Sequence, residues 1–563
     1  MTTPAEFNPF DSAARQFPAF AAALKHHETG DLTGARKAYL ELTDRPLLTA
    51  LCLHQLGVIA AVKREHVKAG HLFRQAITLE PNLSQGYLNL SAALDQQGNA
   101  PQATAVLVDL GCSLDMRLGR CDLAVPIYRR VLERDPLNYA AHINLGTVLA
   151  RMGDLPAAAG LLLKGMALYG RLFSQVASMT LELLSRLDEK IAGVAAANVP
   201  PPGLPNGSIE KIEDALTTLG KVLSELGHSE EGLLCTRWSV ALAPGYALGH
   251  WNLALALLAQ GNYQEGWEEY EWRWRWPDFP EPRRLLPAAP WQGEALAGKR
   301  ILVWAEQGQG DTIQFSPLLH RLVSEAAEVI LEVPPSLVRL LAHAYPNIKV
   351  ISRPDNPHQV LLESLPDFTV PLMSLPARLG LIPEMLPLAT NYISPLAADE
   401  VVWQTRIQDS SKLNIGVVWA GRPAYSADAK RSMGFANLQP LFDIATVNWY
   451  SLQVGLSQGD PSKAGVDVVE LHPYLNDFAD TAAAIARLDL VITVDTATAH
   501  LTGAMGKQIW LLLPHVPEWR WYNNKIALCW YPGLRIFRQK AIGDWVGLIK
   551  EVRAEIEVRA QQQ

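Results

Sequence analysis

Three short segments in the second half of the chain place charged or hydroxyl side chains at the end of an apolar run. The first, ILVWAEQGQGDTIQFSPLL, predicts a strand that passes through Gly308 and Gly310 into a helix beginning at Asp311-Thr312. Glycines at such a junction let a ligand approach the backbone closely, and the first N–H groups of a helix favour anions. Asp311 is therefore either a helix cap or a general base at a cleft edge.

The second segment, LDLVITVDTATAHLTGAMGKQIWLLLP, predicts a buried strand that ends at Asp495. Thr496, Ala497 and Thr498 would form the first turn of a helix that carries His500. Free N–H groups, two hydroxyls and a histidine at one helix start favour a phosphate or pyrophosphate site. The alternative is a capped strand–helix turn with a structural histidine; the phosphate interpretation is favoured because α/β lobes bind ligands at the carboxyl ends of their strands.

The third segment, NIGVVWAGRPAYSADAKRSM, predicts a strand that opens into a basic loop. The loop carries Arg422, Lys430 and Arg431, which could neutralise a departing phosphate. Because surface basic residues are usually solvated and bind no ligand, only Arg431 among the three is preferred as a phosphate contact. None of the three segments has the GxGxxG dinucleotide fingerprint or a P-loop lysine, which argues against a dehydrogenase or an NTPase.

The elements that must position these segments follow a repeating order. From residue 299 onward, short β-branched runs alternate with helical periodicity, which indicates parallel α/β sheets. The runs fall into two groups, so we predict two Rossmann-like lobes, at 299–400 and 401–563. An amphipathic helix predicted at 542–556 is expected to pack back on the first lobe.

The first half of the chain has a different period, with small and large residues recurring at the spacing of tetratricopeptide repeats (TPRs). One copy is marked by Leu56-Gly57, Ala69, Phe73, Ala76 and Pro81. The pattern predicts a TPR array at 1–190, further repeats at 211–278 and a connector at 279–298. The register slips near 111–120, and the Pro/Gly-rich stretch at 191–210 is either a loop inside one superhelix or a hinge, with the loop preferred.

Carboxamides recur at one position of the first helix in several repeats. They are Gln55, Asn89, Asn144 and Asn252, at the position that faces the concave side of such arrays. A carboxamide both donates and accepts, so each could bind a peptide unit of an extended ligand. The alternative is that asparagine is simply common at this position.

The composition is that of an ordered globular protein. The 563 residues are 49% hydrophobic and 19% charged, with a net charge of -8 that gives no basic field for nucleic acid. No apolar stretch predicts a membrane span, the first residues MTTPAEFNPF do not resemble a secretory signal, and the five cysteines have no metal-like spacing. These features favour a reduced, cytoplasmic protein without a membrane or nucleic-acid partner.

At the three segments the chain resembles TPR-fused bacterial glycosyltransferases related to the heptosyltransferases. The resemblance is carried by EQGQGDTIQF, by VVWAGRP with KRSM, and by VDTATAHLTGAMGK followed by PEWRWY. The combination with repeats also resembles the flagellin glycosyltransferases of alphaproteobacteria, whose repeat arm grips flagellin and whose GT-B part transfers a nonulosonic acid such as pseudaminic acid. The resemblance covers nearly the whole chain and implies a TPR superhelix followed by a GT-B fold.

The resemblance also implies residue roles. Asp311 matches the acidic position proposed as base, in the acceptor-side lobe, while Asp495, Thr496 and His500 match the phosphate-binding turn DTG-x-x-H of the nucleotide-sugar lobe. Ala497 stands where that turn usually has glycine, which leaves the donor identity open.

The expected reaction transfers a sugar from a nucleotide-sugar, for example a CMP-linked one, to a Ser or Thr hydroxyl of a polypeptide such as flagellin. The hydroxyl needs a base, and the leaving phosphate needs N–H groups and a cation, for which Lys430 or Arg431 matches the family. No DxD-like acidic pair occurs in these segments, so transfer is expected to need no metal and no other cofactor. Inversion at the anomeric carbon is implied by the resemblance alone.

Two other functions remain open at this point. The α/β half could be an inactive remnant that serves as a scaffold, although intact Asp311, Asp495 and His500 argue against this. The chain could also modify a lipid or polysaccharide, with the repeats recruiting a partner enzyme.

Overall fold

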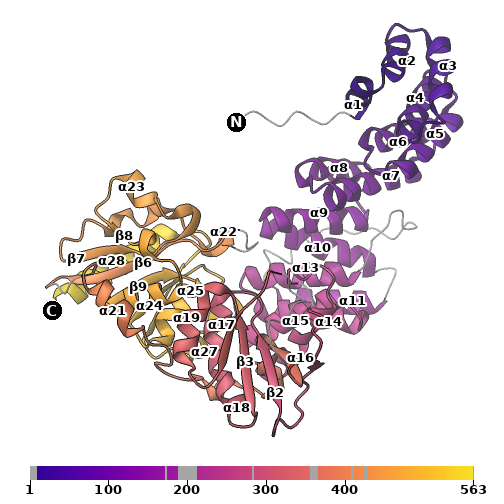
Figure 1. Ribbon diagram of the computed structural model, residues 1–563. Coiled ribbons are helices and arrows are strands. Elements are labelled where there is room, and N and C mark those ends of the chain that lie inside the picture. Colours follow the sequence, from indigo (N-terminus) through magenta and orange to yellow (C-terminus); the bar gives the residue numbers. More distant parts are fainter. Residues whose placement is uncertain are drawn as a thin grey trace. The chain divides into compact units, whose positions relative to one another are not determined.

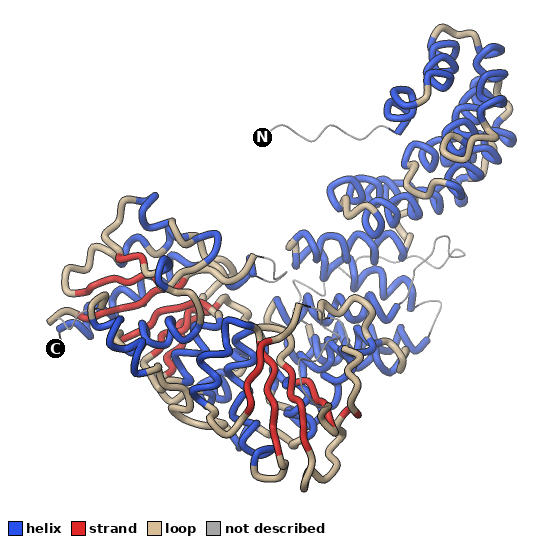
Figure 2. The backbone as a smooth tube through the Cα atoms, viewed as in Figure 1, coloured by secondary structure: helices blue, strands red, loops and turns tan. Residues whose placement is uncertain are grey.

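The computed structural model places most of the chain in helices and parallel strands (Figures 1 and 2). The residues that the structure describes are 9–170, 174–187, 212–281, 284–355, 365–407, 411–423 and 428–561. The Pro/Gly-rich stretch predicted at 191–210 lies outside them. The chain forms two compact units, Met1–Gly249 and His250–Gln563.

The described part of the first unit consists of helices that pack in consecutive pairs, as in a TPR array (blue in Figure 2). They are α1 (Pro9–Gln16), α2 (Pro18–Glu28), α3 (Leu32–Leu42), α4 (Thr49–Val62), α5 (His66–Leu79), α6 (Ser84–Gln96), α7 (Ala100–Cys112), α8 (Cys121–Arg134), α9 (Tyr139–Met152), α10 (Leu155–Gly170), α11 (Ser174–Arg186), α13 (Ile212–Glu225) and α14 (Ser229–Leu242).

Small residues let the paired helices touch. A Cβ added to Gly57 on α4 would lie 2.7 Å from the ring of Phe73 on α5, and one added to Gly146 would lie 2.8 Å from Leu162. Such distances leave no room for a side chain, so these glycines set the spacing of the pairs. Where the repeat register slips, α7 continues into a π-helical turn, η1 (Ser113–Arg117), which absorbs the extra residues.

The second unit begins with helices α15 (Ala247–Gln260) and α16 (Tyr263–Tyr270) and the 3-10 turn η2 (Glu271–Arg275). Two sheets with helices follow, and their strands are red in Figure 2. The first lobe contains β1 (Ala289–Pro290), β2 (Arg300–Trp304), α17 (Gln309–Phe315), α18 (Leu319–Val323), β3 (Glu328–Val333), α19 (Pro335–Ala344), β4 (Lys349–Ser352), β5 (Phe368–Pro371) and α20 (Leu375–Arg378). Helix α21 (Ala397–Gln404) leads to the second lobe.

The second lobe contains β6 (Leu413–Val418), α22 (Asp428–Arg431), β7 (Val447–Ser451), α23 (Asp460–Ala464), β8 (Val469–Glu470), α24 (Phe478–Ala486), β9 (Leu490–Val494), α25 (Ala497–Ala504), β10 (Ile509–Leu513), α26 (Trp519–Tyr522), α27 (Asn524–Trp530), β11 (Leu534–Arg538) and α28 (Trp545–Gln561). Short 3-10 turns connect several of these elements.

Both sheets are parallel, with the order β1-β5-β2-β3-β4 in the first and β11-β10-β9-β6-β7-β8 in the second. In each sheet the strand order reverses beside an early strand, between β2 and β5 and between β6 and β9. Ligands of open α/β sheets bind outside the carboxyl ends of the strands at such reversal points. The predicted fold class, a helical repeat array followed by two Rossmann-like lobes, is confirmed.

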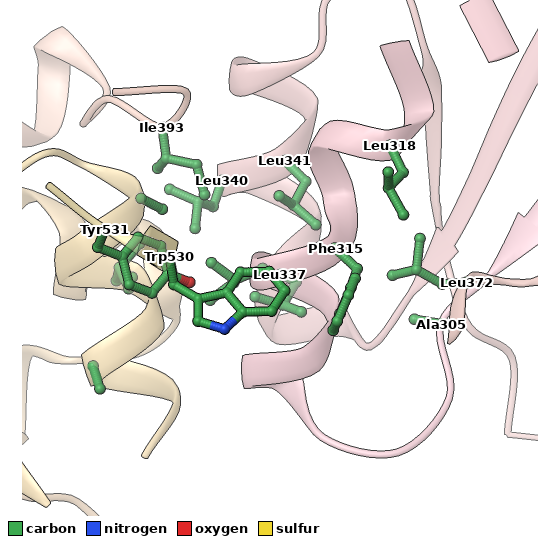
Figure 3. Packing of buried hydrophobic residues seen from close by; sticks show 14 of the residues in the cluster. Ala305, Phe315, Leu318, Leu337, Leu340, Leu341, Leu372, Ile393, Trp530 and Tyr531 are labelled. Atoms are coloured by element: carbon green, nitrogen blue, oxygen red, sulfur yellow. The ribbon is translucent and has the colours of Figure 1, made fainter. Parts of the chain in front are cut away.

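One apolar core joins the two lobes to the helices that precede them. It includes Leu258 on α15, Trp267 on α16 and Ile301 on β2, and it continues to Trp530 at the end of α27. The Trp530 ring lies 5.6 Å from that of Phe315, centroid to centroid, and Figure 3 shows it between Tyr531 and Phe315. Helices α15 and α16 therefore belong to the packing of the α/β unit.

The terminal helix differs from the expectation. It begins at Trp545, and its buried residues Leu548, Ile549 and Val552 join the core of the second lobe. The prediction that it packs on the first lobe is wrong, because its apolar face is covered by its own lobe. Ile542, predicted to be part of that face, is 65% exposed.

Candidate functional site

Asp311 sits in the first turn of α17, directly after the loop that follows β2. Its Oδ2 accepts a hydrogen bond from the N–H of Gly308, the N-cap residue, at 2.8 Å. Its Oδ1 pairs with the guanidinium of Arg520. The structure thus shows a capping role for one oxygen, and the other faces a cation from the second lobe.

Arg520 is a residue that the sequence interpretation missed. It lies on α26 after β10, its side chain is 9% exposed, and it also contacts Glu518. Its Nε donates to Oε1 of Gln314 at 2.7 Å, and its guanidinium lies 4.4 Å from the Trp519 ring. Burial alone would lower the pKa of Arg520, but the carboxylates of Glu518 and Asp311 raise it above its ordinary value, so the side chain stays charged.

A signal for Arg520 was present in PEWRWY, where an acid and a base alternate with aromatic residues directly after a buried strand. Such a pair is out of place in an apolar segment unless a partner compensates the charge. That partner, Asp311, is 209 positions away in the chain.

Gly310 brings the starts of α17 and α25 together. A Cβ added to Gly310 would lie 2.8 Å from Cδ2 of His500 and 3.3 Å from Cα of Ala497. This approach joins the two lobes at their strand–helix junctions, and α17 and α25 lie side by side in Figure 1. Contact between the two helices accounts for Gly310 without a ligand.

The turn after β9 begins at the buried Asp495 and continues through the half-buried Thr496, Ala497 and Thr498. Thr496 is the N-cap residue of α25, yet its hydroxyl lies 3.0 Å from that of Thr493 and does not cap the helix. Thr498 follows in the first turn, where helical N–H groups have no intrahelical partner. Burial raises the pKa of Asp495, and the charge of Arg431 opposes this shift.

His500 is 5% exposed, and its Nδ1 lies 3.0 Å from the Tyr531 hydroxyl. Burial lowers the pKa of His500 well below its usual range, and Arg520 and Arg431 lower it further. The imidazole is therefore neutral at pH 7, and it can donate or accept a hydrogen bond without adding charge.

Arg431 and Lys430 end the short helix α22. Arg431 is half-buried, donates from Nε to Asp428 Oδ1 at 3.0 Å, and packs on Gly421, where an added Cβ would meet its Nη2 at 2.6 Å. Its charge acts on Asp495 and His500, whereas the side chain of Lys430 is exposed. Of the two, Arg431 is the one whose charge acts on the turn after β9.

The four carboxamides all lie on first helices of repeat pairs and are half-buried. Asn89 on α6 is within 3.0 Å of His54 Nε2 on α4 and accepts from Gln85, and Asn144 on α9 donates to Cys112 Sγ at 3.2 Å. These contacts give both asparagines a structural role between neighbouring repeats. Gln55 lies on α4, and Asn252 lies on α15 in the second unit.

No group of three or more His, Cys, Asp or Glu side chains suited to hold a metal ion occurs among the described residues. In the same part of the chain, every helix is too short or too polar to cross a bilayer.

Comparisons with known proteins agree with the resemblance carried by the motifs. A tetratricopeptide repeat family model matches residues 113–169. Protein FlbA of Caulobacter vibrioides is 24% identical over 387 residues, which is 58% of this chain and 64% of FlbA. The photosystem I assembly protein Ycf3 of Acaryochloris marina is 28% identical over 114 residues, 20% of this chain and 64% of Ycf3. The chain thus matches less than two thirds of each of these relatives.

Solved structures with similarity to parts of the chain include glycosyltransferases. A glycosyl transferase family 9 protein of Veillonella parvula matches 48% of this chain with 100% of its own length, at 12% identity and a TM-score of 0.35. The ADP-heptose lps heptosyltransferase II of E. coli covers 47% with 99% of its own length, at 12% identity and a TM-score of 0.35. An O-GlcNAc transferase of Thermobaculum terrenum covers 82% with 93% of its own length, at 14% identity and a TM-score of 0.28.

Proposed function

We propose that the chain is a protein O-glycosyltransferase that moves a sugar from a nucleotide-sugar to a Ser or Thr hydroxyl of a polypeptide. The observation that carries the proposal is the meeting of two strand–helix junctions, at which Asp311 of one lobe faces Arg520 of the other. The motif resemblance supports the reaction class. The proposed placement puts the acceptor on the side of the first lobe and the donor on the side of the second.

In the proposed reaction, the donor phosphates bind near the start of α25, where the first helix N–H groups, the imidazole of His500 and the positive charge of Arg431 favour an anion. The diphosphate of a nucleoside diphosphate sugar, or the phosphodiester of a CMP-linked sugar, also competes for Arg520. This competition draws the guanidinium away from Asp311. Asp311 Oδ1 then accepts the proton of the acceptor hydroxyl as the oxygen attacks the anomeric carbon. The bond from that carbon to the phosphate oxygen breaks, and its electron pair leaves with the nucleotide.

Arg431 and Arg520 supply positive charge where the leaving group becomes an anion, so transfer is proposed to need no metal ion. Inversion of the anomeric carbon is part of the proposal, since a single displacement with Asp311 as base inverts the centre. We further propose that the reaction takes place in the cytoplasm, where the five free cysteines would stay reduced.

The repeats are proposed to bind the polypeptide acceptor. The motif resemblance favours flagellin as acceptor and a nonulosonic acid as sugar, for example from a CMP-linked donor. The carboxamides Asn89 and Asn144 are proposed contacts, although each already serves a neighbouring repeat. Replacing both by Ala tests this directly, and the proposal expects a pull-down of the acceptor to weaken about tenfold, the effect of losing two peptide hydrogen bonds.

The deciding experiment incubates the full chain with a panel of nucleotide-sugars and with candidate acceptors, flagellin among them, in buffer with EDTA. Mass spectrometry should find the acceptor heavier by one or more sugar residues attached through Ser or Thr. Transfer to a lipid or polysaccharide but not to protein would support the alternative acceptor class. If no donor binds by calorimetry and no sugar moves, the chain is a scaffold.

A further inference from the structure

The loop that leads from β2 to Asp311 is held by side chains from α16 and η2. Glu306 in this loop is fully buried, and it accepts hydrogen bonds from Arg273 Nη2 at 2.9 Å and from the N–H of Met373 at 3.3 Å. The next residue, Gln307, accepts a hydrogen bond at its Oε1 from the hydroxyl of Tyr270 at 2.9 Å. Tyr270 is 1% exposed.

Gln307 has an unusual backbone conformation. Its φ of 63° lies in the left-handed region, which disfavours side chains other than glycine. Such a conformation persists only where the surroundings hold it. Hydrogen bonds from Tyr270 to Gln307 and from Arg273 and the Met373 N–H to Glu306 hold the loop in this conformation.

The conformation at Gln307 determines where Gly308 points its N–H. That N–H donates to Oδ2 of Asp311 at 2.8 Å, so a chain of contacts runs from the Tyr270 hydroxyl through the Gln307 amide and the Gly308 N–H to the Asp311 carboxylate. The other oxygen of Asp311, Oδ1, is the one that pairs with Arg520. The direction of that oxygen therefore depends on the loop.

We infer that Tyr270 and Arg273 are positioning residues for Asp311, and that the segment 270–275, which is the end of α16 together with η2, is required to hold the Asp311 carboxylate in place. The inference rests on the proposed function for Asp311. Periodicity places this segment in the repeat array, but its side chains hold the strand–helix junction of the first lobe.

Tyr270→Phe in the full chain is the test, because Arg273 is buried among carboxylates and its removal would threaten folding. Tyr263→Phe is the matched control: Tyr263 lies on the same helix and is also 1% exposed, and among the described residues its hydroxyl makes no hydrogen bond with the loop that leads from β2 to Asp311. We expect Tyr270→Phe to lower kcat about tenfold, the rate equivalent of one hydrogen bond, with donor Kd unchanged. Tyr263→Phe should leave both at wild-type values.

A second pair of variants separates loop conformation from general damage. Glycine adopts a φ of 63° without strain, so Gln307→Gly in the Tyr270→Phe background should restore most of kcat, whereas Gln307→Ala should not. Hydrogen exchange gives a readout that needs no activity: the Gly308 amide should exchange faster in Tyr270→Phe and not in Tyr263→Phe.

The possible outcomes are distinguishable. Unchanged amide exchange in Tyr270→Phe overturns the inference, whether or not the protein transfers sugar. Equal losses of kcat in the two Tyr→Phe variants also overturn it, since they would reflect a general packing effect. If the wild type transfers nothing, the proposed function fails, and the exchange of the Gly308 amide still decides whether Tyr270 holds the loop.

Discussion

The two strand–helix junctions, β2 to α17 and β9 to α25, look alike in sequence but differ in environment. Each follows a buried parallel strand and carries an aspartate and small residues. At the first junction Asp311 remains 18% exposed at its side chain and faces Arg520, whereas at the second Asp495 and neutral His500 are buried. The first junction is thus suited to accept a proton at a partly exposed carboxylate. The second is suited to offer a neutral imidazole and backbone N–H groups to an anion.

This difference shows why a strand–helix turn is not one kind of site. The start of α25 has its orphan N–H groups and a neutral imidazole, which suit a phosphate. At the start of α17, one oxygen of Asp311 already accepts the hydrogen bond of the N-cap N–H. The other oxygen of the same carboxylate remains for chemistry. Four measurements test this division of roles between the two junctions.

The largest effect is expected for Asp311→Asn. Asparagine keeps an oxygen that can accept from the Gly308 N–H, so the helix cap is retained, but it cannot take up the acceptor proton. Transfer should fall by about a hundredfold or more, whereas donor affinity should not fall, because the donor no longer competes with a carboxylate at Asp311 for Arg520. Steady-state kinetics and calorimetry on the same sample measure both. Near-normal turnover would make Asp311 a helix cap and would move the search for a base to other acidic residues or to His320.

Arg520→Ala should give the next largest effect, because one guanidinium serves both Glu518 and Asp311. Loss of a cation from a buried pair lowers the free energy of unfolding by about 3 kcal/mol, and donor affinity should drop by about tenfold to a hundredfold for want of a charge-assisted contact. Arg520→Lys is the matched variant, since lysine keeps the charge but lacks the planar fork whose two nitrogens contact Asp311 and Glu518 separately. Wild-type donor affinity in both variants would exclude a role for Arg520 in phosphate binding.

The contrast between the junctions also marks what the sequence could predict. Both junctions are local, since a β-branched run followed by glycines or hydroxyls and a helical pattern is contained within about twenty residues. Hence Asp311, Asp495, Thr496 and His500 could be placed at strand–helix junctions from periodicity alone. The pairing of Asp311 with Arg520 could not, because it depends on how two lobes pack, over 209 positions.

Gly310 and α16 illustrate the same limit. Glycine in a strand–helix turn predicts close approach, but the sequence does not say of what; here it is His500 and Ala497. Periodicity identifies the helices at 247–270 as repeat-like, yet it does not reveal that Trp267 packs within the core of the α/β unit. Tertiary packing, which local patterns do not encode, decides both cases.

A moderate effect is expected at the second junction from Arg431→Ala and from His500→Ala. Each should weaken nucleotide binding about tenfold, since each removes one hydrogen bond to an anion. Lys430→Ala is the matched control, because Lys430 neighbours Arg431 but its side chain is exposed. Calorimetry with the nucleotide alone measures the affinities, and circular dichroism checks the fold. Wild-type affinity in all three variants would mean that the nucleotide binds elsewhere.

The smallest effect is a pH dependence of stability that belongs to the second junction. Burial lowers the pKa of His500 well below the usual 6.5, so below pH 6.5 the unfolded chain binds a proton that the folded chain does not. His500 therefore stabilises the fold above pH 6.5, and this contribution is lost as the pH falls toward its folded pKa. Urea unfolding at pH 7.5 and 5.5 should show a larger loss for wild type than for His500→Gln. His320→Gln, which alters an exposed histidine of α18, is the control and should lose as much as wild type. An equal loss in His500→Gln would mean that the imidazole is protonated in the folded chain, and the second junction would then carry a charge there as the first does.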